Sequence, residues 1–370
     1  MWYRATVVLR SRVDGGRFSA WFSSDGGDDD VGVNGKLEIP KKPVSNKKKS
    51  AKERLVEFCG LFSKEDQVLV VINADPDAIA SAMAVKRLLR YRVKSVTIAY
   101  PNEIRRLNNV VMVDLLKIPM ERLHTVKVGD FTKKVMLDSQ PSHLPCFENI
   151  TFDAVIDHHP ASKGWIAPFV DIRKDFGATA SMLVEYLRAG NLKPSVALAT
   201  ALFYAIKVDT RNFEKKATLA DAISFRYLFN IANQNLVRKI ELSSFRRSEL
   251  NYFKTALNEM KVSKQRLYAH LGKVSSPDML VLIADFLNQV HDVAWVFVSG
   301  LHNDKLVVIF RCDGYKKNAG RLAEKMFQAI GSAGGHREAA RAEVPLRNLP
   351  AERHEFSTKT LMRLTTKHLL

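Results

Sequence analysis

Short apolar runs alternate along the first half of the chain with segments whose apolar residues have helical spacing. Such runs are typical of strands buried in a parallel sheet, and they predict strands at 67–72, 95–100, 135–138, 152–157 and 169–172. Helical spacing predicts helices at 51–62, 78–89, 107–116, 177–188 and 196–207, and we expect Gly190 to close helix 177–188 as a left-handed cap. The alternation predicts an α/β fold with a doubly wound, mostly parallel sheet.

The second half of the chain has a different pattern. Residues 218–260 have helical spacing, many charges and no strand signal. Beyond them, the pattern predicts strands at 266–271, 293–300 and 305–312 and helices at 280–290 and 319–330. We therefore expect a smaller α/β C-terminal domain, joined to the first domain by a helical connector.

The domain boundaries follow from these patterns. Residues 1–50 mix Gly, Asp, Ser and Lys with poor periodicity, which predicts a disordered or weakly ordered basic extension. We place the first α/β domain at 51–215, the helical connector at 216–262 and the C-terminal domain at 263–370.

The chain is strongly basic, with a net charge of +18 from 57 Lys and Arg against 39 Asp and Glu. This charge favours a polyanionic partner, and nucleic acid is the usual one. Part of the excess lies in the extension and the C-terminal tail, so charge supports nucleic acid without establishing it. No apolar run is long enough to cross a bilayer, and the three cysteines form no disulfide or metal pattern. We expect a cytoplasmic protein with no membrane partner, and the sequence leaves a homodimer open.

Acidic and imidazole side chains follow three of the predicted strands. They are Asp75 and Asp77 after the first strand, Asp138 at the end of the third, and Asp157 at the end of the fourth, followed by His158 and His159. Ligands of open parallel sheets bind outside the carboxyl ends of the strands. Carboxylates this close together repel one another unless cations lie among them, and this donor set suits Mn²⁺ or Mg²⁺ better than structural zinc. Two such ions a few ångströms apart commonly catalyse phosphoester hydrolysis.

Two further groups are candidates for the same chemistry. Asp209 follows a nearly apolar helix, and we prefer a metal ligand there to an ordinary helix-end aspartate because the site still lacks one carboxylate. In Gly334-Gly335-His336, glycines would let backbone amides approach a phosphate, and a helix after them would add its dipole. With Arg311 at the end of a predicted strand, this segment is a candidate anion clamp.

This set of motifs resembles the DHH family of phosphoesterases over roughly Asp66 to Met362. The C-terminal Gly334-Gly335-His336, with Arg311 before it, resembles the DHH-associated substrate-binding domain. The matching stretches of the first domain are Asn73–Ser81, Asp138, Asp157–His159, Phe176–Ala180 and Ile206–Thr210.

The resemblance implies a two-ion site at the edge of the sheet. Asp75 would bind the first ion and Asp77 the second, and Asp138 would bridge them. His158 and Asp209 would complete the second site. One position departs from the family, because Val71 stands where members commonly have a histidine. The first site would then bind its ion weakly, and we expect it to fill only at high Mn²⁺ or together with substrate.

The resemblance also implies catalytic and substrate-binding roles. Asp157 would orient a histidine, and His159 would contact the scissile phosphate or help proton transfer. A metal-bound hydroxide would attack phosphorus in line. A second phosphate would be held by four residues of the C-terminal domain, namely Arg311, Gly334, Gly335 and His336.

The leading hypothesis is an Mn²⁺-dependent phosphoesterase, with Mg²⁺ as the other candidate ion. Its substrates would be short RNA or DNA oligonucleotides, linear dinucleotides or nucleotide phosphates. The alternatives are a degenerate member that binds nucleic acid or nucleotide without turnover, a RecJ-like single-strand exonuclease, and an inorganic pyrophosphatase. The absence of an obvious extra oligonucleotide-binding barrel weighs against the RecJ type, and Val71 motivates the degenerate one.

Overall fold

The computed structural model describes residues 49–214, 217–315, 317–349 and 356–369. By its internal contacts the chain divides into residues 1–48 and 49–370. The basic extension predicted at 1–50 therefore lies almost wholly outside the described residues. None of the described helices combines the length and the apolar character needed to span a bilayer.

The first sheet has six strands, all paired in parallel, in the order β3-β2-β1-β4-β5-β6. Their bounds are β1 Gln67–Ile72, β2 Ser95–Tyr100, β3 Glu121–Arg122, β4 Lys133–Leu137, β5 Ala154–Asp157 and β6 Phe169–Ile172. From β1 the chain runs outward to β3 on one side, then returns to β4 and runs outward to β6 on the other. This order confirms the doubly wound parallel sheet.

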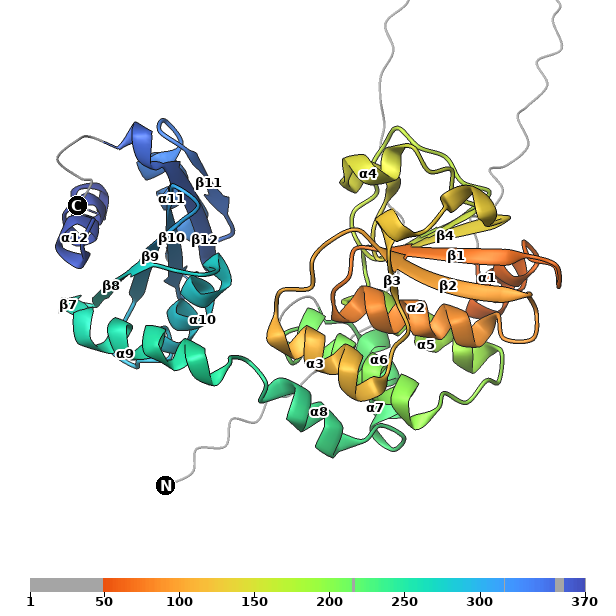
Figure 1. The fold of residues 1–370 in the computed structure, drawn as a ribbon. Helices are drawn as coiled ribbons and strands as arrows, with labels where there is room; N and C mark the ends of the chain where they lie inside the picture. The colour runs from red at the N-terminus through yellow and green to blue at the C-terminus, as the bar shows by residue number, and fades with distance from the viewer. Residues whose placement is uncertain (1–48, 215–216, 316, 350–355, 370) are drawn as a thin grey trace, which may run out of the picture. The chain divides into compact units, whose positions relative to one another are not determined.

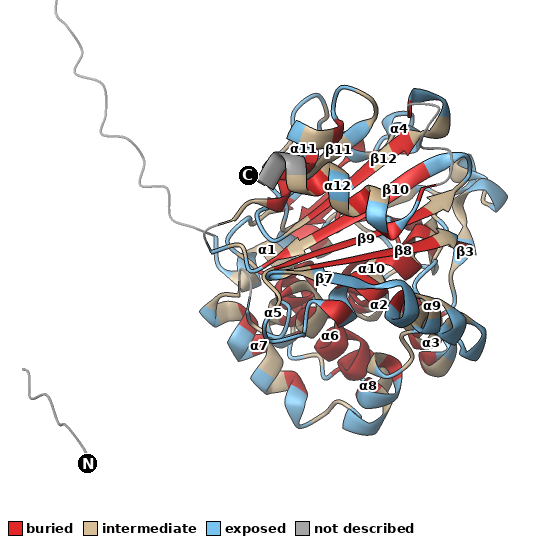
Figure 2. Ribbon diagram, turned by 90° about the vertical axis from the view of Figure 1, so that its left-hand side faces the viewer, coloured by how far each residue is buried: buried red, intermediate tan, exposed pale blue. Residues whose placement is uncertain are grey.

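Both faces of the first sheet are covered. The helices are α1 Ala51–Cys59, α2 Pro76–Leu88, α3 Leu107–Leu116, α4 Pro145–Glu148, α5 Thr179–Ala189 and α6 Val196–Asp209. Side chains of a strand alternate between faces, so Val68 and Val70 of β1 join the core cluster that holds α2, α5 and α6. Leu69 and Val71 join Phe147 of α4 on the other face. Figure 1 shows α2, α5 and α6 below this sheet and α4 above it. Most residues of β1, α2 and α6 are buried, which Figure 2 shows for α6.

The end of α5 differs from the sequence prediction. Gly190 follows the helix with a φ of −83°, which any residue can adopt, so it is not a left-handed cap. The left-handed residue is Asn191, with a φ of 52°. Asparagine is the residue that most often replaces glycine in this conformation, because its short polar side chain tolerates it.

Three helices fill the stretch that the sequence predicts to be helical. They are α7 Leu219–Phe229, α8 Gln234–Glu241 and α9 Leu250–Glu259. Short 3₁₀ turns occur at Leu123–Thr125, Val128–Asp130, Pro141–His143, Arg247–Glu249 and Leu346–Asn348. The observed elements agree with a helical connector, and its boundaries remain a prediction.

The second sheet has six strands in the order β11-β12-β10-β9-β8-β7. They are β7 Lys261–Ser263, β8 Arg266–Lys273, β9 Trp295–His302, β10 Lys305–Cys312, β11 Ser332–Gly335 and β12 Ala339–Pro345. Only β8 and β9 pair in parallel, joined by helix α10 Pro277–Leu287, and the other pairs are antiparallel. The described residues also hold α11 Ala319–Phe327 and α12 Thr358–Leu369. The patterns did not predict β7, β11, β12 or α12.

Candidate metal centre

The candidate site lies where the winding of the first sheet reverses, between β1 and β4. In doubly wound sheets this is the position at which loops diverge and leave room for a ligand. Asp75 and Asp77 follow β1, Asp138 follows β4, and Asp157 is the last residue of β5. The topology therefore brings all three predicted strand ends to one edge of the sheet.

Asp77 is fully buried and is held by the N-terminus of α5. Its two carboxylate oxygens accept hydrogen bonds from the backbone amides of Thr179 and Ala180, each at 2.7 Å. These amides are among those that a helix leaves unpaired at its start. Burial and the nearby charge of Asp209 raise the pKa of Asp77 to about 8. The carboxylate is thus fixed in position but costly to ionise without a cation.

Asp138 is the most constrained acid of the group. Its φ of 54° is left-handed, a conformation that Asp and Asn tolerate better than most residues. The Thr179 hydroxyl donates to its Oδ1 at 2.8 Å. Burial, and then the charge of Asp77, raise the pKa of Asp138 well above its usual range. The bend at the end of β4 therefore points a buried carboxylate at other carboxylates.

His158 is oriented so that one ring nitrogen faces these acids. Its Nδ1 lies 3.2 Å from the carbonyl oxygen of Phe176. Its Nε2 lies 3.5 Å from Asp138 Oδ1 and 3.3 Å from Asp209 Oδ2. Nε2 is buried and has no hydrogen-bond partner of acceptable geometry among the described residues. A histidine whose other nitrogen meets a backbone carbonyl is a typical metal ligand.

Two groups of ligand atoms have metal-binding spacing. Within each group all atoms lie within 4.8 Å of one another, and the groups are Asp77, His158 and Asp209, and Asp138, His158 and His159. Carboxylate and imidazole donors at this spacing fit a divalent cation such as Mn²⁺. The structure thus brings together four of the five predicted ligands, together with His159, which we expected at the phosphate.

Asp75, the fifth predicted ligand, belongs to neither group. Its Oδ1 accepts a hydrogen bond from the Ala78 amide at 3.0 Å and so caps α2. Burial raises the pKa of Asp75 to about 6. Val71, which stands in place of the family histidine, is fully buried among Leu69 and Met136 in the apolar cluster on the opposite side of β1 from α2. The proposed first ion site therefore has fewer metal-ligating side chains than the proposed second site.

A second chain of contacts lies behind His159. The Asp157 Oδ1 lies 2.8 Å from His159 Nδ1, and its Oδ2 accepts a 2.6 Å hydrogen bond from Nε2 of Gln140. Gln140 is fully buried, and its Oε1 accepts from the amide and hydroxyl of Ser162 at 2.6 and 2.7 Å. Burial opposes ionisation of Asp157, but the hydrogen bonds from His159 and Gln140 outweigh it and lower the Asp157 pKa.

The sequence did not single out Gln140 or Thr179. Thr179 lies inside segment 176–180, which resembles the family, but the sequence analysis gave Thr179 no role of its own. Gln140 lies two residues after Asp138, and nothing in its local pattern distinguishes it from a loop residue.

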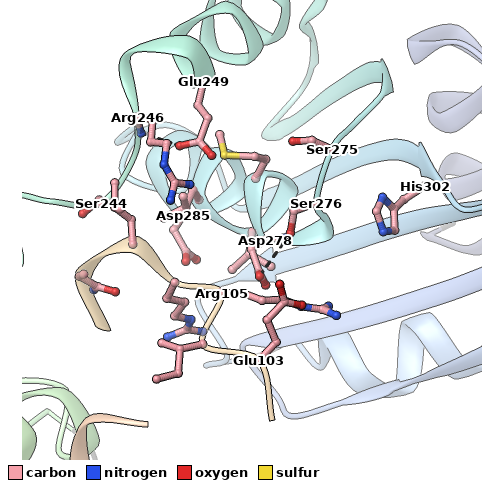
Figure 3. Close-up of a pocket in the computed structure, with 17 residues that line it drawn as sticks. Glu103, Arg105, Ser244, Arg246, Glu249, Ser275, Ser276, Asp278, Asp285 and His302 are labelled. Carbon is pink, nitrogen blue, oxygen red and sulfur yellow. Dashed lines mark hydrogen bonds and ion pairs between the residues drawn. The ribbon is translucent and has the colours of Figure 1, made fainter. Parts of the chain in front are cut away.

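Arg311 has a partner that the sequence did not reveal. Its Nε lies 2.6 Å from Asp285 Oδ1, and one of its terminal nitrogens donates to the Phe310 carbonyl. Asp285 belongs to α10, and Figure 3 shows it with Asp278, whose carboxylate accepts a 3.3 Å hydrogen bond from the Ser276 hydroxyl. In this conformation Asp285 neutralises the charge of the guanidinium and occupies its Nε, so a phosphate would have to compete with Asp285.

The Gly334-Gly335-His336 segment is a strand and turn, not a loop before a helix. The His336 amide donates to the Ala339 carbonyl at 2.8 Å, which closes the turn from β11 into β12. The Gly320 amide, at the start of α11, donates to the His336 carbonyl at 2.9 Å. The predicted dipole contribution of a following helix is therefore wrong. The side chain of His336 is exposed and remains available to a ligand.

Comparisons with known proteins agree with this geometry. The family model for the DHH family, N-terminal domain, matches residues 67–206. An uncharacterized protein of Methanocaldococcus jannaschii is 33% identical over 281 residues, which are 75% of this chain and 58% of that protein. The chain thus spans less than two thirds of this relative.

Two solved structures share the fold. An exopolyphosphatase-related protein from Bacteroides fragilis matches with a TM-score of 0.64 and 15% identity, covering 87% of this chain and 98% of that one. RecJ from Thermus thermophilus, in complex with Mn²⁺, matches with a TM-score of 0.50 and 15% identity, covering 86% and 54%. At these identities the likeness concerns the fold alone. From the family match and the site geometry together, residues 67–206 are a DHH family N-terminal domain.

Proposed function

We propose that this chain is a metal-dependent phosphoester hydrolase. The observation that carries the proposal is the convergence of Asp77, Asp138, His158 and Asp209. The buried Nε2 of His158 lies 3.5 Å from Asp138 and 3.3 Å from Asp209 but forms no hydrogen bond of acceptable geometry with the described residues. Bound divalent ions would supply a Lewis acid and lower the pKa of a water molecule. Mn²⁺ is favoured because the donors are carboxylate and imidazole, and because the RecJ structure holds it.

The residues of the chain would hold and orient the reacting groups. Thr179 fixes Asp138 and, through its amide, Asp77, so the two acids keep their separation when a cation binds. The side chain of His159 is 46% exposed and leans on the buried Asp157. In this contact the protonated Nδ1 of His159 donates a hydrogen bond to the Asp157 carboxylate. Nε2 of His159 then remains free to meet a substrate phosphate or a leaving oxygen.

The proposed substrates are short RNA or DNA oligonucleotides, linear dinucleotides or nucleotide phosphates. The net charge of +18 supports a polyanion of this kind. We keep residues 51–215 as the proposed catalytic unit, 216–262 as the connector and 263–370 as the substrate-binding unit. In the last of these, the exposed His336 is a stronger candidate for a phosphate contact than the paired Arg311.

The test is hydrolysis of 5′-labelled dinucleotides with Mn²⁺, with inorganic pyrophosphate assayed in parallel. Asp138→Asn is the sharpest variant, because asparagine also tolerates the left-handed backbone at this position. We expect mononucleotide release by the wild type and a loss of at least 100-fold in Asp138→Asn. Asp114→Asn, on the exposed face of α3, is the matched control and should keep full activity. Equal rates in Asp138→Asn and the control would refute the proposal.

The non-catalytic alternative is favoured by one observation, the valine at position 71. Its burial in an apolar cluster leaves Asp75 and Asp138 as the protein ligands proposed for the first ion. We expect equilibrium dialysis to detect one tight Mn²⁺ per chain and a second that binds only at higher concentration. Tight dinucleotide binding with no release of mononucleotide at saturating Mn²⁺ would favour the non-catalytic alternative instead.

A further inference from the structure

A second candidate binding site lies at the other end of α2 from the metal centre. An open pocket of about 310 Å³ is lined by α1, by the last turn of α2 with the loop after it, and by the segment that follows α5. Asp77 lies in the first turn of α2 and Leu88 is its last residue, so at about 1.5 Å per residue the helix separates this cavity from Asp77 by roughly 16 Å. The cavity is therefore distinct from the metal centre. Figure 1 shows α2 running along the sheet between these two ends.

The charge of this cavity is uniformly positive. Arg87, Arg90 and Arg92 line it, and none of the described residues that line it is acidic. The guanidinium groups of Arg87 and Arg92 form no ion pair or hydrogen bond with the described residues. Arg87 lies in the last turn of α2, where a cation also complements the helix dipole. Arg90 and Arg92 lie beyond the helix, so the dipole does not account for them.

Tyr91 stands between these arginines in an unusual state. The residue is 79% exposed, and its φ of 68° is a left-handed conformation that bulky residues rarely adopt. The Arg90 guanidinium lies over the ring, 4.8 Å from its centroid. An exposed aromatic on a strained backbone gains little from the fold itself, and such strain is concentrated at ligand sites. The ring and its cation together form a flat surface on which a base can stack.

The floor of the cavity is apolar and shaped by a missing side chain. Leu55 of α1, Leu88 of α2 and Leu192 line it beside Gly190. A Cβ added at Gly190 would lie 3.1 Å from a methyl carbon of Leu55 and 3.5 Å from one of Leu192. A planar group could therefore rest against this floor while its charged part meets the arginines.

We propose that this arginine pocket, formed by Arg87, Arg90, Tyr91 and Arg92, binds a single strand of nucleic acid. The arginines would contact consecutive phosphates, and Tyr91 would stack on one base. The site holds the strand far from the metal centre, so it provides affinity without taking part in hydrolysis. This inference goes beyond the proposed function, because strand binding at the pocket is measurable without a metal ion.

The experiment measures fluorescence anisotropy of a labelled oligouridylate with the full chain in EDTA, over a range of KCl concentrations. Each phosphate contact to a single strand contributes about 0.7 to the slope of log K against log salt. The variant Arg87→Ser/Arg90→Ser/Arg92→Ser should therefore lower this slope by about 2. The matched control is Arg226→Ser/Arg238→Ser/Lys239→Ser, which removes the same charge from exposed positions of α7 and α8. Equal slopes in the two triple variants would overturn the proposal.

Tyr91→Asn separates stacking from folding. Asparagine accepts the left-handed backbone, so the melting temperature should stay the same or rise. Loss of one stacked base, worth about 1–3 kcal/mol, should weaken binding by roughly 5- to 150-fold without changing the salt slope. Unchanged affinity would overturn the stacking role. If AMP competed as strongly as unlabelled oligouridylate, the pocket would bind a mononucleotide, and the proposal that it binds a strand would be overturned.

Discussion

Gln140→Leu is the substitution that best tests how the metal edge positions His159. Leucine nearly matches glutamine in volume but can neither donate nor accept a hydrogen bond. In the wild type, Nε2 of Gln140 donates to Asp157 Oδ2 at 2.6 Å and to the Pro160 carbonyl at 3.1 Å. Oε1 of Gln140 accepts from Ser162. Gln140 is therefore a positioning residue that reaches His159 through Asp157.

The size of the effect follows from these contacts. Asp157 is fully buried, and a hydrogen bond to a charged group contributes about 1.5–3 kcal/mol. Leaving Oδ2 and the Ser162 amide unpaired should lower the free energy of unfolding by about 3 kcal/mol. The residue that orients a catalytic or ligating histidine typically contributes a factor of about 10–100. We expect kcat to fall by that factor while KM changes little, because the substrate contacts themselves remain.

The assay compares kcat, KM and thermal stability of Gln140→Leu with those of Thr200→Val. Thr200 is also fully buried, and its hydroxyl bonds the backbone of Val196 and Asn233 away from the metal edge. Thr200→Val should lose stability but keep kcat. If Gln140→Leu lost stability but kept the wild-type kcat, the positioning argument would be refuted. Gln140 would then contribute only to the stability of the fold.

Three further predictions concern other parts of the fold. Thr179→Val should weaken Mn²⁺ binding about 10-fold in equilibrium dialysis, because Asp138 loses its 2.8 Å hydroxyl donor, whereas Thr179→Ser should retain it. Gly335→Ala should lower the melting temperature markedly, because its Cβ would overlap the carbonyl oxygen of Ala339 and the φ of 152° is strained for a side chain. Gly334→Ala meets nothing closer than 3.8 Å and should be tolerated. Burial lowers the pKa of His270 to about 4, so below its unfolded pKa of about 6.5 the unfolded chain binds a proton that the folded chain does not. The free energy of unfolding should therefore fall by about 2 kcal/mol between pH 7 and pH 5, a loss that His270→Gln should remove in thermal denaturation.

Five of the six strands of the first sheet could be predicted from the sequence because their signals are local; the two-residue strand β3, Glu121–Arg122, was not predicted. Three of the predicted strands and helix α3 have the predicted bounds, since short apolar runs between turn residues admit few alternatives. The second sheet was harder. Strand β11, Ser-Ala-Gly-Gly, has no apolar run and exists because it pairs with β12. Its strand character comes from a partner in the sheet, which no local pattern encodes.

That Asp77, Asp138 and His158 would lie near one another could also be predicted from local signals, because parallel strands deliver their ends to one edge. What could not be predicted is the set of groups that hold these acids. Thr179 reaches Asp138 across 41 residues and Asp77 across 102, and Gln140 reaches Asp157 across 17. Arg311 shows the same limit, because a strand-end arginine is a candidate clamp until the structure reveals Asp285 beside it.

The positions of the groups that hold these acids also bear on the consequence of having Val71 in place of the family histidine. Asp77, His158 and Asp209 draw their support from α5, from the Phe176 carbonyl and from the end of α6, and none of these depends on residue 71. A histidine at 71 would instead have to enter an apolar cluster in which a buried polar group is costly without a partner. The proposed second ion site would therefore keep its ligands even where the proposed first site is weak. We expect such a chain to bind the proposed first ion most readily when a substrate phosphate supplies an oxygen ligand in place of the imidazole nitrogen that Val71 cannot supply.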